Sequence, residues 1–155
     1  MWNEIVCKDD LNSFMSLFGG FHDSCLKEIK YVSGAYVNND LSMHPFNKDR
    51  SLKVIFQRQY ENPSVIEMEF FGLLKMNLFL EDADFYTCEI TSATMILYED
   101  EVIWCDCGGL SENDIKNYEG ILICGSRVRW RPVDEYIGQN EVYKSVDFKN
   151  SCGLA

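Results

Sequence analysis

Side chains that could perform catalysis are few in this sequence. His22 and His44 are its only histidines, so a catalytic triad or a two-histidine metal site would need one or both of them. A small hydrolase-like enzyme would use His22, oriented by a carboxylate, with Ser24 or a cysteine as nucleophile, but residues adjacent in sequence rarely present their side chains to one another in that way. We interpret Phe21-His22-Asp23-Ser24 as a structural junction in which Asp23 or Ser24 binds nearby backbone. A binding role for this loop is the alternative.

The cysteines do not indicate a disulfide framework or a complete metal site. They are seven in number and scattered: Cys7, Cys25, Cys88, Cys105, Cys107, Cys124 and Cys152. We expect reduced thiols, mostly buried. Cys105-Asp106-Cys107 could form half of a zinc site, but no second closely spaced Cys or His pair completes it. Motifs for nucleotides, zinc or a nucleophilic serine are absent, and we expect no cofactor and no metal.

Acidic residues are concentrated in one part of the chain. Between Met76 and Ile115 there are ten carboxylates and no Lys or Arg. The candidate partner-binding residues are Glu81, Asp82, Asp84, Glu99, Asp100 and Glu101. They belong either to ordinary polar loops or to an electronegative face that steers a cationic protein. Calcium is a minor alternative, because Glu81-Asp82-Ala83-Asp84 lacks the spacing and the glycine of a calcium loop.

The total charge limits the kinds of partner. Lys and Arg number 14 and Asp and Glu number 25, which gives a net charge of −11 and a pI near 4.5. Such a charge opposes binding to nucleic acid or to an anionic membrane surface. A partner attracted by charge should therefore be a basic protein, and the sequence does not indicate the oligomeric state.

Three arginines are a local exception to this acidity. Arg127, Arg129 and Arg131 alternate with Val128 and Trp130, so a strand would project three guanidinium groups from one face. We expect cross-strand pairs with carboxylates such as those at positions 67, 69 or 89. A phosphate or nucleic-acid site is the minor interpretation, because Trp130 is the only interleaved aromatic side chain.

Length and periodicity predict one mainly antiparallel β domain over residues 1–155. A helix is expected over 9–18, where apolar residues recur at helical spacing, and Gly19-Gly20 should end it. Strands are expected over 26–32, 36–43, 52–59, 65–71, 73–80, 85–98, 102–106, 121–124 and 127–131. One N-terminal helix with this meander predicts an α+β fold with a curved antiparallel sheet or a partly closed barrel.

Export and membrane signals are not found. The first ten residues lack a basic region followed by an apolar one. No apolar run approaches the roughly 20 residues that a membrane-spanning helix needs. We therefore expect a cytoplasmic protein without membrane partners.

Three segments carry a resemblance to a known family. Phe21-His22-Asp23-Ser24 leading into Leu26-Lys27-Glu28-Ile29 resembles the opening of a family of small bacterial immunity proteins associated with polymorphic toxin systems. Residues 65–80 look like that family's middle strand pair, and Glu101-Val102-Ile103-Trp104 resembles a later strand. The resemblance spans roughly residues 20–106. It implies a non-catalytic protein that neutralises a cognate toxin, with no catalytic residues to carry over.

The leading hypothesis is a non-enzymatic, acidic interaction domain that binds a basic toxin, as an immunity protein does, or another basic partner. Its acidic residues would contact the partner by electrostatic complementarity. The alternatives are a small hydrolase-like enzyme using His22 and an accessory or structural subunit. An enzyme needs a concave pocket that converges on His22, whereas a binding domain needs an exposed acidic surface.

Overall fold

The computed structural model describes residues 1–80, 82, 84 and 87–144. Within them, the main sheet consists of β1 (Asn3–Ile5), β2 (Ser24–Val32), β5 (Ser51–Arg58), β6 (Val65–Asn77), β7 (Glu89–Ile90), β8 (Thr94–Tyr98), β9 (Glu101–Cys105) and β10 (Leu122–Pro132). The helices are α1 (Lys8–Leu17) and α2 (Glu112–Ile115), with 3-10 turns at Gly19–Phe21 and Asp134–Tyr136. The expected α+β class with one main N-terminal helix is confirmed.

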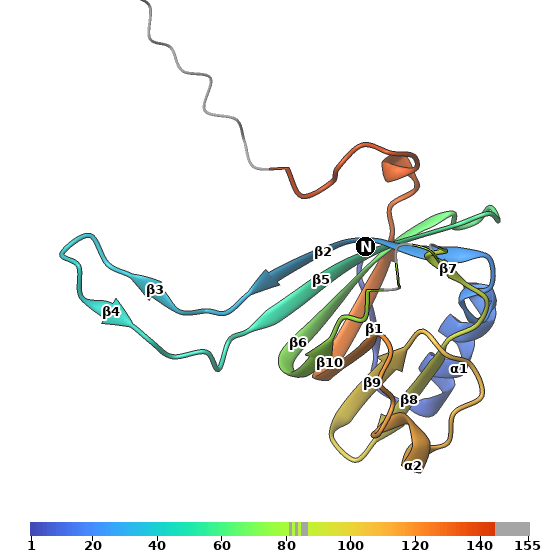
Figure 1. Cartoon of the computed structure of the whole chain (residues 1–155), viewed down its shortest axis with the longest axis horizontal. Helices are drawn as coiled ribbons and strands as arrows, with labels where there is room; N and C mark the ends of the chain where they lie inside the picture. Colours follow the sequence, from blue (N-terminus) through green and yellow to red (C-terminus); the bar gives the residue numbers. More distant parts are fainter. Residues whose placement is uncertain (81, 83, 85–86, 145–155) are drawn as a thin grey trace, which may run out of the picture.

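The sheet is antiparallel and curls into a half-barrel (Figure 1). Its strand order is β7-β2-β5-β6-β10-β9-β8, and β1 pairs with residues 128–130 of β10 on the edge opposite β6, beyond the end of β9. The helix α1 packs near β1 and β8. Its buried Leu11 and Phe14 continue the apolar spacing seen in the sequence, and Asp10 accepts hydrogen bonds from the backbone N–H groups of Val6 and Cys7.

The two longest strands each replace a pair of expected strands. Residues 65–71 and 73–80 were expected as separate strands, but β6 continues through Gly72, whose φ is +53°. A Cβ at Gly72 would lie 2.4 Å from Ser126 Oγ. Similarly, 121–124 and 127–131 belong to the single strand β10, with a register shift between Cys124 and Gly125. In both strands glycine permits an irregularity without ending the strand.

Two other expected strands are wrong because the structure divides each of them into two short strands. The span 36–43 contains two short strands, β3 (Tyr36–Val37) and β4 (Met43–His44), which pair only with each other. The span 85–98 contains β7 and β8 at opposite edges of the main sheet, separated by a bend at 91–93. Apolar residues in both spans match the pattern of a strand, but a turn or bend inside each span separates it into two strands.

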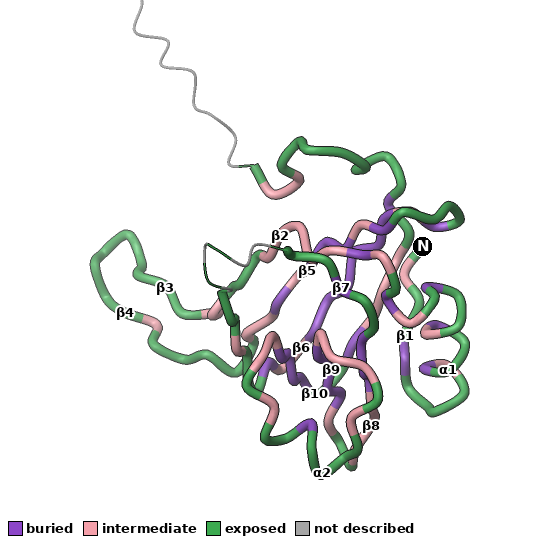
Figure 2. The backbone as a smooth tube through the Cα atoms, turned by 45° about the vertical axis from the view of Figure 1, so that its right-hand side comes forward, coloured by how far each residue is buried: buried purple, intermediate pink, exposed green. Residues whose placement is uncertain are grey.

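Both faces of the central strands are covered, and Figure 2 shows the buried backbone there. On the concave face Leu52, Val54 and Phe56 are fully buried, as their alternation predicted. On the other face, Ile55 packs with Val133 and with the chain that follows β10. Among the described residues, no helix has the length and apolar character to cross a membrane.

Candidate functional site

The junction after α1 is a structural turn, as the sequence predicted. Phe21 adopts a φ of +65° and is fully buried, and Asp23 also has a positive φ. Ser24 Oγ donates a 2.6 Å hydrogen bond to the Phe21 carbonyl, and Ser24 is only 3% exposed. This hydroxyl is thus committed to the turn and is not presented as a nucleophile.

His22 is oriented by a carboxylate but has no nucleophile beside it. Its Nδ1 lies 2.9 Å from Asp23 Oδ1, and the imidazole is 62% exposed. The Tyr60 hydroxyl donates to the other Asp23 oxygen at 3.1 Å, which raises the pKa of the Tyr60 phenol. In the described part of the chain, no hydrogen bond joins His22 Nε2 to a hydroxyl or thiol. The geometry therefore does not assemble the hydrolase constellation.

Two of the three stripe arginines on β10 form ion pairs, as expected, whereas Arg127 is exposed and its guanidinium group lies over the Phe71 ring. Arg129 contacts Glu69 with Nε at 2.8 Å and Nη2 at 2.6 Å. Arg131 contacts Glu67 with Nε at 2.7 Å and Nη2 at 2.6 Å. The Trp2 ring lies against both guanidinium groups, at 4.4 and 4.5 Å from their central carbons. Glu89, the third expected partner, lies at the edge of the sheet on β7.

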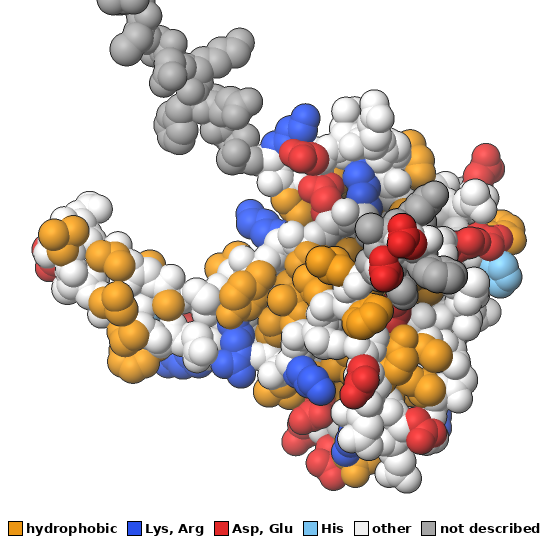
Figure 3. All heavy atoms as spheres, viewed as in Figure 1, with side chains coloured by type: hydrophobic (Ala, Val, Ile, Leu, Met, Phe, Trp, Pro, Cys, Tyr) orange, Lys and Arg blue, Asp and Glu red, His pale blue; other side chains and the backbone are white. Residues whose placement is uncertain are grey.

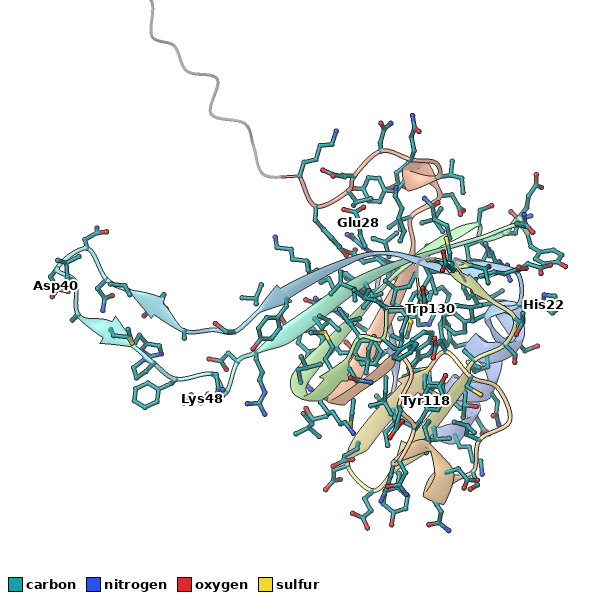
Figure 4. All side chains as sticks on the ribbon, viewed as in Figure 1. His22, Glu28, Asp40, Lys48, Tyr118 and Trp130 are labelled. Atoms are coloured by element: carbon teal, nitrogen blue, oxygen red, sulfur yellow. The ribbon has the colours of Figure 1, made fainter. Side chains whose placement is uncertain are left out.

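The chain after β10 docks on this same face through two glutamates. The Glu28 carboxylate accepts the backbone N–H groups of Val142 and Tyr143, at 2.7 and 3.1 Å. The Tyr143 hydroxyl donates to Glu67 Oε1 at 2.9 Å. Burial, together with this carboxylate, raises the pKa of the Tyr143 phenol. Figure 4 shows Glu28 beneath the docked segment. The Glu67 carboxylate therefore binds Arg131 and Tyr143 at the same time. Because Arg129 and Arg131 both pair with glutamates, they do not form a free pair that could bind a phosphate.

The candidate acidic residues belong to two separate connections. Asp82 and Asp84 follow β6, whose last residue pairs with Leu122, opposite the Cys105 end of β9. Glu99 and Asp100 form the exposed turn at the other end of β9. The connection that follows β6 thus begins level with the Cys105 end of β9, whereas the turn of Glu99 and Asp100 lies at the Glu101 end. Glu81 lies outside the described residues.

Glu101 differs from the other acidic candidates because it is partly buried. Its carboxylate accepts a weak hydrogen bond from the Cys124 thiol at 3.5 Å. It lines a pocket with Lys75 and Lys116. Burial and the Glu101 charge raise the pKa of Cys124 to about 12. Glu101 therefore faces local groups, whereas Asp82, Asp84, Glu99 and Asp100 are exposed.

No described group of side chains forms a metal site: clusters of three or more Cys, His, Asp or Glu ligands are absent from that part of the chain. Asp106, at the centre of Cys105-Asp106-Cys107, accepts hydrogen bonds from Tyr118 and from the backbone of Ile121. The six described cysteines are free thiols. The expectation that most are buried is wrong for these six, because only Cys105 and Cys124 are buried, while Cys7 and Cys88 are exposed.

A projecting hairpin is the feature that sequence reasoning missed. We define the arm as residues 33–47, which contain β3 and β4 and extend away from the half-barrel (Figure 1). Asp40 lies at its tip, at the opposite end of the molecule from His22 (Figure 4). Asn38-Asn39-Asp40 is a turn signal that could have divided the expected strand 36–43. Hydrophobic side chains gather on the arm (Figure 3).

Comparisons with known proteins return no family model, no curated protein and no solved structure that matches this chain.

Proposed function

We propose that this chain is a non-enzymatic domain that binds a basic protein, as an immunity protein binds and neutralises its toxin. The observation that carries the proposal is a difference between the buried carboxylates, which form ion pairs, and the exposed ones, which do not. Buried carboxylates engage Arg129, Arg131 and Lys53. The exposed carboxylates of the two acidic connections form no ion pair with any residue that the structure describes. The excess negative charge is therefore available to an external cation.

The mechanism is electrostatic steering followed by occlusion. A local excess of one sign of charge raises the rate of encounter with the opposite sign, by a factor of roughly 10–10³ at low salt. Charges at the rim of an interface act mainly on association, and less on dissociation. The resemblance of the Phe21–Ser24 junction and of the strand that follows it to immunity proteins supports the same function, and it requires no catalytic group.

The test uses the product of the neighbouring gene as the probe, because an immunity gene adjoins its toxin gene, and the proposal expects that product to be a basic protein. The acidic variant carries Asp82→Asn, Asp84→Asn, Glu99→Gln and Asp100→Asn. A matched control carries Asp9→Asn, Glu61→Gln, Glu135→Gln and Glu141→Gln, which are also exposed and unpaired among the described residues. Both variants lose four negative charges, so they separate local charge from net charge.

Surface plasmon resonance or stopped-flow fluorescence would measure the association rate at several salt concentrations. We expect the rate to fall as the Debye length shortens from about 10 Å at 0.1 M to about 3 Å at 1 M salt. The acidic variant should associate roughly tenfold more slowly at low salt, with a much smaller loss for the control. Association that is indifferent to salt and to both variants would refute the proposed role of these carboxylates.

A further inference from the structure

Two of the free cysteines lie at one edge of the sheet. Cys25 is on β2, and Cys88 immediately precedes β7, the edge strand that pairs with β2 (Figure 1). Both line a cavity of about 550 Å³, which Ile137 and Gly138 also border. Cys25 is half-buried and Cys88 is exposed. Two thiols that share a cavity, one of them open to solvent, form a candidate site of oxidation.

The strand register sets the separation of the two cysteines. Cys25 lies directly opposite Glu89, the residue after Cys88. Directly opposed residues of antiparallel strands have Cα atoms about 4.5–5.5 Å apart, and a step of one residue along a strand adds roughly 3.4 Å at a right angle. The Cα atoms of Cys25 and Cys88 are therefore about 6 Å apart, inside the usual disulfide range of roughly 4.4–6.8 Å.

The orientation of the Cys88 side chain is not fixed by the sheet. On a regular strand, alternation would turn the neighbours of Glu89 away from Cys25. Cys88 precedes the first residue of β7, so the pleat does not impose this alternation on it. Both cysteines instead contribute to the wall of one cavity, which gives their side chains room to rotate. Burial raises the pKa of the Cys25 thiol, and the charge of a Cys88 thiolate raises it further, which also indicates that the two sulfur atoms are near each other.

We propose that Cys25 and Cys88 form a reversible disulfide when hydrogen peroxide oxidises the protein. In the first step the exposed Cys88 thiolate attacks one peroxide oxygen, the O–O bond breaks, and a sulfenic acid forms while the released hydroxide takes up a proton. In the second step the Cys25 sulfur attacks the Cys88 sulfur, the S–O bond breaks and a second water leaves. The two thiols together lose two electrons and two protons, and the peroxide is reduced to two molecules of water.

The disulfide would secure a short element of the sheet. β7 contains two residues and is joined to β2 by two residue pairs. The connection that carries Asp82 and Asp84 leads into it. A disulfide that closes a long loop stabilises a protein mainly by restricting the unfolded chain. Oxidation should therefore fix one end of this connection and raise the Tm of the protein by about 5 °C or more.

The experiment treats the reduced full chain with a few equivalents of hydrogen peroxide and then blocks the remaining thiols with N-ethylmaleimide in denaturant. The endoproteinase Glu-C cleaves after Asp and Glu, so cleavage at Glu89 separates Cys88 from the cysteines later in the chain. Mass spectrometry without reduction should find the Cys25 and Cys88 peptides joined, and dithiothreitol should release them. The link should form roughly tenfold faster in the native protein than in urea, because the fold holds the two thiols together.

Single substitutions separate the two steps. Cys25→Ser should leave Cys88 as a sulfenic acid that dimedone traps, whereas Cys88→Ser should leave Cys25 reduced. Cys7→Ser is the matched control, because it removes another exposed thiol, and it should leave the formation of the link unchanged. Circular dichroism would verify that all three variants are folded.

Three results would overturn the inference. The first is oxidation of Cys88 to a sulfinic acid in the wild type without a linked product. The second is a link that forms equally fast in urea, because the fold then does not position the pair. The third is a lower Tm for the linked protein, because the sheet edge must then distort to reach disulfide geometry. The inference does not depend on the proposed function, since none of these results bears on the binding of a basic protein.

Discussion

Removing the charge of Glu67 tests whether the arginines of β10 serve the fold. Glu67 is 2% exposed and accepts two hydrogen bonds, one from Arg131 Nε and one from the Tyr143 hydroxyl, and Arg131 Nη2 lies 2.6 Å from the same carboxylate. Removing one member of a fully buried ion pair costs about 3–5 kcal/mol, whereas an exposed pair is worth about 0–1 kcal/mol. The Arg131 side chain is 36% exposed, so water compensates part of its loss. We expect Glu67→Gln to lower the free energy of unfolding by about 2 kcal/mol, which lies between these limits.

Urea unfolding followed by circular dichroism would measure this change. For a chain of this size, a loss of about 2 kcal/mol corresponds to a fall in Tm of roughly 4–8 °C. Glu89→Gln is the matched control, because Glu89 is exposed and forms no ion pair within the described region. It should change stability by less than about 0.5 kcal/mol.

A double-mutant cycle of Glu67→Gln with Arg131→Met would isolate the coupling between the two side chains. We expect the second substitution to cost less when the first is present, because the arginine has already lost its carboxylate. If Glu67→Gln is as benign as Glu89→Gln and the cycle shows no coupling, the reasoning fails. The arginines of β10 would then be free to bind an external anion.

Two further predictions concern titratable groups. A maleimide reagent should label the exposed Cys7 and Cys88 in the native protein. It should label Cys105 and Cys124 only after denaturation, because burial raises the pKa of these two thiols. Mass spectrometry of the labelled peptides would detect the difference, and rapid native labelling of Cys124 would contradict it. The raised phenol pKa of Tyr143 keeps its stabilising contribution intact below the unfolded pKa of about 10 and removes it at higher pH, where only the unfolded phenol ionises. Urea unfolding at pH 9 and pH 11 should therefore show a smaller loss of stability for Tyr143→Phe than for wild type, and identical losses would show that the hydrogen bond to Glu67 does not hold the proton.

The parts of the fold that follow from local pattern were predictable. Alternation identified the concave face of β5, and helical spacing identified α1 within one residue at each end. Alternating arginines on β10 correctly implied carboxylate partners at Glu67 and Glu69. In each case the periodicity of the chain directly determines which side chains share a face.

The remaining parts depend on contacts between distant segments. The apolar residues at the two ends of the span 36–43 are compatible with a strand whether the span packs on the body or projects from it, so periodicity could not identify the arm. The docking of the chain after β10 depends on Glu28, more than one hundred residues earlier in the sequence. Asp82 and Glu99 lie in one acidic stretch of the sequence, but the register starts the Asp82 connection level with the Cys105 end of β9 and places Glu99 at the other end of that strand.

The distribution of charge connects the fold to the proposed function. Burying the Glu67 and Glu69 carboxylates of β6 without partners would cost free energy, and their ion pairs with Arg131 and Arg129 offset that cost. Each pair is electrically neutral, so it leaves the negative charge of the acidic connections unchanged. As a result, a protein with 14 basic side chains still presents unpaired carboxylates at Asp82, Asp84, Glu99 and Asp100 in the part that the structure describes. Glu67→Gln or Glu69→Gln should therefore destabilise the sheet, as urea unfolding would measure, and should also slow association with a basic protein slightly, because each removes one negative charge from the chain.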